Sequence, residues 1–71
     1  MLSDEIMGAS ELEYLINEWV VGRNGERDRK IMKRKLIDGI SFEKLAEEFD
    51  ISVRQAKNIV YKRKTIIYLK R

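Results

Sequence analysis

Side chains that could do chemistry are concentrated near the carboxyl end of the chain, between residues 53 and 61. Arg54, Lys57, Asn58 and Tyr61 lie there together with Val53, and all five stay outside if the surrounding apolar residues pack together. Arginine and lysine donate hydrogen bonds to guanine and to phosphates, while asparagine forms a paired contact with adenine. We therefore expect this stretch to contact nucleic acid, and double-stranded DNA in particular.

Two short helices across a tight turn are needed to position these side chains. Apolar residues follow helical spacing on both sides of the turn in the segment FEKLAEEFDISVRQAKNIVY: Leu45 and Phe49, then Ala56 and Ile59. The small side chain of Ala46 lets the two helices approach closely. Asp50 stands at the turn, where we expect positive φ, which aspartate adopts more readily than most side chains. The pattern predicts a helix-turn-helix within residues 41–64.

The charges are segregated along the chain. Residues 1–22 contain five acids and no lysine or arginine, whereas residues 51–71 contain seven basic residues and no acid. The net charge of +3 for the whole chain hides this asymmetry. A solvated helix face usually mixes glutamate with lysine, so the unmixed basic end favours a polyanionic partner.

The composition leaves little room for catalysis. The 71 residues make one small domain and include neither cysteine nor histidine, so the commonest catalytic base and the best metal ligands are missing. Glu43, Glu47 and Glu48 lie on the outward side of the third helix with Lys44 among them, which is typical of a solvated helix face. We expect no enzyme activity, no cofactor and no metal site.

The sequence also lacks the signals of a membrane or secreted protein. No apolar run reaches the ~20 residues that span a bilayer, and the first residues are acidic where a signal peptide is basic. We expect a cytoplasmic protein with no membrane partner.

The remaining periodicity predicts an all-α fold, a small bundle of four helices. We expect residues 1–9 to be a flexible N-terminus and residues 10–71 to form a single domain. Ser10 and Glu13 form a capping box for a first helix over residues 11–21, whose inward stripe includes Trp19.

Three further helices follow. Asn24 is the expected cap of a helix over residues 26–37, which Asp38-Gly39 stops. Ser41 caps the third helix. Ser52 with Gln55 forms another capping box, which opens a fourth helix that continues to about Tyr68.

Residues 26–62, ERDRKIMKRKLIDGISFEKLAEEFDISVRQAKNIVYK, resemble the promoter-binding region four of bacterial sigma factors of the sigma-70 class. Such segments share a basic helix, an acidic-Gly break, a capped helix and a recognition helix that follows a serine. The resemblance implies a helix-turn-helix protein of the kind found in phages and mobile elements, which binds duplex DNA and acts in transcription. Asp50 replaces the glycine more common at the turn.

The resemblance also implies particular contacts with DNA. By position, the base contacts fall on Arg54, Gln55, Lys57 and Asn58. We expect contacts with the DNA backbone from these residues: Lys33, Arg34, Ser41, Tyr61, Lys62, Arg63 and Lys64. Two of the assignments have structural alternatives, because Gln55 can serve mainly as the partner of Ser52 and Arg34 can pair with Asp38.

Other functions stay open. The chain could be a protein-interaction module that binds RNA polymerase or another regulator, or the DNA-binding part of a recombination or mobile-element system. The acidic first helix and an apolar tail support the first of these, because an exposed tail of Ile66, Ile67, Tyr68 and Leu69 would seek a partner or form a homodimer. Alternatively, the tail folds back onto the first helix and completes the core.

Overall fold

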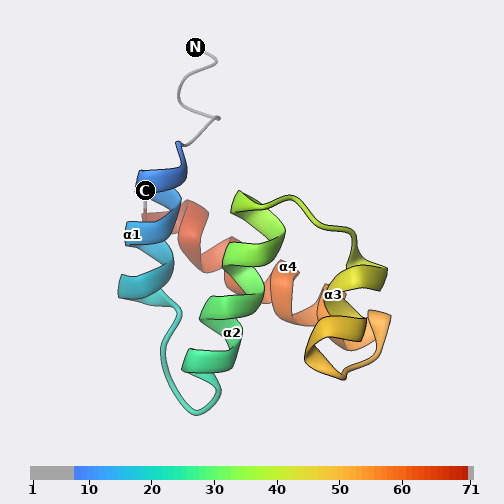
Figure 1. The fold of residues 1–71 in the computed structure, drawn as a ribbon. Helices are drawn as coiled ribbons and strands as arrows, with labels where there is room; N and C mark the ends of the chain where they lie inside the picture. The colour runs from blue at the N-terminus through green and yellow to red at the C-terminus, as the bar shows by residue number, and fades with distance from the viewer. Residues whose placement is uncertain (1–7, 71) are drawn as a thin grey trace.

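Five helical elements follow one another in the structure, a computed structural model that describes residues 8–70. They are α1 (Ala9–Trp19), α2 (Gly25–Met32), the π-helical turn η2 (Lys33–Ile37), α3 (Phe42–Phe49) and α4 (Val53–Lys70). Helices α1 and α2 lie side by side, and α4 crosses both of them (Figure 1). The described part of the chain contains no strand, so the predicted all-α class is confirmed.

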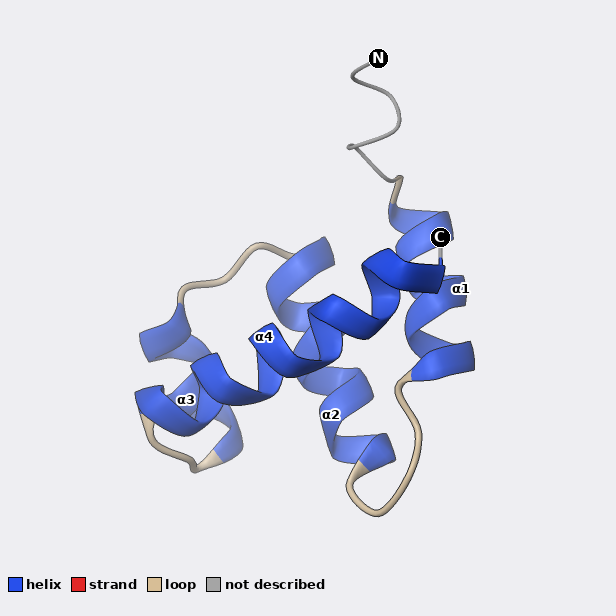
Figure 2. Cartoon of the chain, turned by 180° about the vertical axis from the view of Figure 1, so that it is seen from behind, coloured by secondary structure: helices blue, strands red, loops and turns tan. Residues whose placement is uncertain are grey.

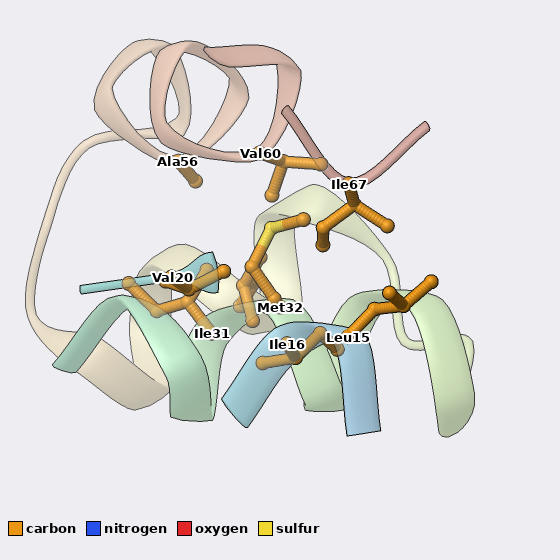
Figure 3. Close-up of a cluster of buried hydrophobic side chains, with 9 residues drawn as sticks. Leu15, Ile16, Val20, Ile31, Met32, Ala56, Val60 and Ile67 are labelled. Carbon is orange, nitrogen blue, oxygen red and sulfur yellow. The ribbon is translucent and has the colours of Figure 1, made fainter. Parts of the chain in front are cut away.

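Helix α4 closes the core from one side. Its buried residues Ala56, Val60 and Ile67 recur at helical spacing and point toward α1 and α2 (Figure 3). Ile16 and Met32, which are fully buried, meet them from those two helices. Because Ile67 is also fully buried, this one residue of the tail packs into the core, as the second alternative predicted. Leu69, in contrast, is 76% exposed.

The first helix begins earlier than predicted. Helix α1 starts at Ala9, where the backbone N–H of Leu12 donates to the carbonyl of Gly8, and no side chain caps it. Ser10 is already inside the helix, so the predicted capping box with Glu13 is wrong. The rest of the predicted flexible N-terminus, residues 1–7, lies outside the described residues. Trp19 is not in the core but 39% exposed at its edge, where the ammonium of Lys70 lies 4.5 Å from the centre of its ring.

Backbone geometry explains where the middle elements begin and end. Gly22, with φ +98°, turns the chain between α1 and α2. Asn24 takes the cap position of α2, but it uses its backbone carbonyl, which accepts from the N–H of Asp28, and not its side chain as predicted. The chain leaves η2 through Gly39, with φ +74°, so the predicted stop at Asp38-Gly39 is confirmed.

The predicted local structure around the turn between α3 and α4 is confirmed. The hydroxyl of Ser41 accepts from the N–H of Lys44 at the start of α3. Asp50 adopts the left-handed conformation, with φ 55° and ψ 47°. Ser52 and Gln55 form both hydrogen bonds of a capping box at the start of α4, at 3.0 and 3.2 Å. Ala46 is buried between the helices, at 6% exposure.

Candidate nucleic-acid interface

The outer face of α4 is the most distinctive surface of the molecule. Arg54, Asn58, Tyr61 and Thr65 follow one another at steps of three or four residues, and all four are exposed. In the view from behind, α4 lies in front of α1 and α2 (Figure 2). This face is polar, with Arg54 as its charged residue, and helix α4 as a whole contains six lysine or arginine residues and no acid.

Aromatic packing defines one border of that face. The ring of Phe42, at the start of α3, packs edge-on against the ring of Tyr61, with centroids 5.9 Å apart. Two ammonium groups lie over the same ring: that of Lys35 at 4.3 Å and that of Lys57 at 5.8 Å from its centre. We call these four residues, Phe42, Tyr61, Lys35 and Lys57, the Phe42 cluster. It joins η2, α3 and α4 and holds two cations beside the exposed face.

A cavity lies at the other border. Its volume is about 390 Å³, and Asn58, Lys62 and Arg63 of α4 line it together with residues of α2 and of the turn before it. The turn contributes Arg23, and α2 contributes Arg27 and Asp28. The exposed face of α4 therefore runs between two groups of cations.

All four predicted base contacts lie on the first two turns of α4, and their side chains are exposed: Arg54, Gln55, Lys57 and Asn58. The alternative role of Gln55 as the partner of Ser52 is also confirmed. Only its amide oxygen is used, and within residues 8–70 its amide nitrogen makes no hydrogen bond. The base contacts themselves stay a prediction.

Arg63 is engaged in an ion pair within the protein. Its guanidinium points inward and donates from Nε to Oδ2 of Asp28 at 2.9 Å, and its Nη2 lies 2.9 Å from the same oxygen. Only 14% of the Arg63 side chain and 7% of the Asp28 side chain are exposed. Arg63 follows Ala56 and Val60 on the buried face of α4, and this spacing in the sequence is the signal that predicts an inward position. Arg63 therefore has a structural role between α2 and α4, and its contact with the DNA backbone stays a prediction.

Arg34 is also engaged within the protein. It donates to Oε2 of Glu48 from Nε at 2.9 Å, to Oε1 from Nη2 at 2.9 Å, and to Asp38 from Nη1 at 2.8 Å. The alternative pairing with Asp38 is thus confirmed, while the pairing with Glu48 had no signal in the sequence because the two lie in different elements. The hydrogen bonds from Arg34 hold the pKa of Glu48 below its ordinary value. The pKa of Arg34 is raised, mainly by the hydrogen bonds to Glu48 and secondly by the one to Asp38.

The side chains of the remaining predicted contacts with the DNA backbone differ in their exposure and in their partners within the protein. Lys62 is exposed, and Lys64 is half-buried with its ammonium 5.7 Å from the ring centre of Tyr68. The ammonium of Lys33 lies 4.0 Å from a carboxylate oxygen of Glu13, a weak surface pair. The hydroxyl of Ser41 accepts a hydrogen bond as a helix cap but keeps its own proton to donate.

Comparisons with known proteins do not assign a function to the chain, so the functional assignment depends on the residues described above. No protein-family model, no curated protein and no solved structure matches the chain. Among residues 8–70, no group of three or more acidic side chains is placed to hold a metal ion. No helix in that range is long and apolar enough to cross a bilayer.

Proposed function

We propose that this chain is a sequence-specific duplex-DNA-binding protein, in which α3 and α4 form a helix-turn-helix and α4 enters the major groove. The observation that carries the proposal is the outer face of α4, where exposed Arg54 and Asn58 stand without any acid on the same helix. An α-helix fits the major groove of B-DNA, and arginine and asparagine are the side chains that recognise guanine and adenine there.

The start of α4 supports the proposal through its rigidity. The capping box fixes the first turn of the helix, and the left-handed Asp50 fixes the turn before it. A reading helix needs such support, because base contacts require donor atoms placed within hydrogen-bonding distance of base edges.

From the resemblance to region four of sigma factors, we propose that the DNA binding serves transcription, as a regulator or a sigma-like factor. The same two helices would also serve as the DNA-binding part of a recombination or mobile-element system. Both activities require the same interface. The DNA-binding experiment below therefore tests what they share.

Selection of bound oligonucleotides from a random pool, followed by titration of the selected duplex, tests the proposal. With Arg34 and Arg63 occupied, about four or five cations remain to neutralise phosphates, so the logarithm of affinity should fall against log salt with a slope of roughly −4. A slope near zero, or a pool without enriched sequences, would contradict the proposal.

Three substitutions separate base contacts from backbone contacts. Arg54→Ala should relax the preference for one base, at a cost of about 1–3 kcal/mol on the selected sequence, whereas Lys62→Ala should weaken all sequences alike. Lys30→Ala is the matched control, because this exposed lysine lies on α2 and the pocket that it lines contains no residue of α4. Equal effects of all three substitutions would argue against recognition of bases by α4.

A second candidate is a module that binds RNA polymerase or another regulator. The acidic outer side of α1, with Glu11, Glu13 and Glu18 exposed, favours it, as does the exposed Leu69. The burial of Ile67 in the core leaves less of the apolar tail available to a partner. Co-purification of polymerase with the intact chain tests this candidate.

A further inference from the structure

The cavity beside α4 carries an excess of positive charge. Of its lining residues, Arg23, Arg27, Lys62 and Arg63 are cationic and only Asp28 is acidic, which leaves a local charge of 4 − 1 = +3. The cations come from three places in the chain: the turn before α2, α2 itself and the middle of α4.

The single carboxylate is already shared between two of these cations. Oδ2 of Asp28 accepts from Arg63, and Oδ1 accepts from Nε and Nη2 of Arg27, both at 3.1 Å. Arg23 and Lys62 form no ion pair with any of residues 8–70. Two unpaired cations therefore face a space of about 390 Å³, large enough for a phosphate group and several waters.

We propose that this cavity binds a phosphate of the DNA backbone, through Arg23 and Lys62. The inference rests on the proposed function, because the phosphate is supplied by the duplex that α4 enters. Guanidinium and ammonium groups are the usual protein ligands of phosphate, and arginine binds it in a bidentate manner.

The position of the cavity relative to α4 explains why a phosphate would lie there. A helix in the major groove runs between two sugar-phosphate strands, so it needs positive charge on both of its borders. The Phe42 cluster supplies Lys35 and Lys57 at one border. The cavity supplies Lys62 and Arg23 at the other, and Asn58 lines the cavity from the exposed face itself. Arg23 is the residue that sequence analysis did not select, because it lies 35 residues before Asn58 in the chain.

Substitution of Arg23 tests the inference on the intact chain. Arg23→Gln should leave the folded state unchanged, since Arg23 is exposed and unpaired within the described residues. It should reduce the salt slope by about 1 and weaken binding by up to about eightfold at 0.1 M salt, equally for the selected duplex and for a scrambled one. Lys30→Gln serves as the control. If Arg23→Gln and Lys30→Gln show the same affinity and slope, the inference is overturned.

A titration of the DNA-free protein with inorganic phosphate, monitored by NMR, tests this inference separately from the proposed function. Saturable shifts at Asn58 and Arg27 in the wild type, absent in Arg23→Gln, are expected and would support an anion site in the cavity. If the wild type binds no DNA, the proposed function fails. In that event, the same shifts would indicate that the ligand of the cavity is a free phosphate compound. The proposal that the phosphate belongs to the DNA backbone would then be overturned. Absence of any shift would overturn the cavity as a phosphate site.

Discussion

Loss of the Asp28 charge should destabilise the protein more than any exposed charge change. Asp28 is 5% exposed and holds the guanidinium of Arg63, whose side chain is 14% exposed, across the contact between α2 and α4. In Asp28→Asn, Arg63 would stay in the interior without a counter-charge. Breaking a buried ion pair from one side costs about 3–5 kcal/mol, and we take about 3 because Arg63 keeps some access to water.

This cost is large for so short a chain. At about 0.05–0.15 kcal/mol per residue, the 71 residues have a total stability of roughly 4–11 kcal/mol. A loss of about 3 kcal/mol should lower the melting temperature by roughly 12–24 °C. Urea and thermal unfolding followed by circular dichroism would measure both quantities.

Two further variants complete the test. Glu26→Gln removes an exposed acid from the same first turn of α2 and should change the stability by less than about 0.5 kcal/mol. Combining Asp28→Asn with Arg63→Met removes both charges and should recover much of the loss, because replacing both partners of a buried pair is often close to neutral. If Asp28→Asn is as stable as Glu26→Gln, the ion pair does not hold α4 against α2.

Three other predictions follow from the packing and the surface charges. Ala46→Leu should lower the free energy of unfolding by about 1–3 kcal/mol, because it overpacks the contact between α3 and α4, and should abolish DNA binding. A normal melting temperature of this variant would refute the crossing of these helices. Arg34 lowers the pKa of Glu48, so this ion pair stabilises the folded state at pH values above 4.5, the ordinary pKa of the carboxyl group. The stabilisation is lost as the pH falls through the lowered pKa. Urea midpoints measured across that acid range should therefore fall more steeply for the wild type than for Arg34→Gln, and parallel curves would show that the pair contributes nothing. Ile67→Ala should cost about 2–5 kcal/mol in urea unfolding, since its side chain is fully buried, and a cost below about 1 kcal/mol would show that the tail is not part of the core.

Local interactions explain which parts of the fold the sequence predicts well. The caps at Ser41 and Ser52 and the turn at Asp50 depend on residues no more than three positions apart, so their types and spacing predict them. The same logic fails at Ser10, where nothing in the preceding residues prevents the helix from beginning two residues earlier than predicted, at Ala9. The π-helical turn from Lys33 to Ile37 has no signal of its own in the sequence.

Contacts between distant elements explain what the sequence analysis of the site missed. The basic side chain of Arg63 suggests a contact with DNA, although its position on the buried face of α4 indicates an inward side chain. Its partner Asp28 lies 35 residues away and carries no pattern that links the two. The same holds for Arg34 with Glu48, and for Arg23, which reaches the border of α4 only through the fold. Exposed residues of a single helix, such as Arg54 and Asn58, are accessible to prediction because helical periodicity alone places them on one face.

The most direct test of the account measures whether the protein contacts base edges in the major groove. Replacing guanine and adenine in the selected duplex by their 7-deaza analogues removes the N7 acceptors of the major groove and leaves Watson–Crick pairing intact. Affinity should fall by about fivefold to a hundredfold at the contacted positions, and Arg54→Ala should lose this sensitivity at one of them. Unchanged affinity at every substituted position would contradict the placement of α4 in the major groove.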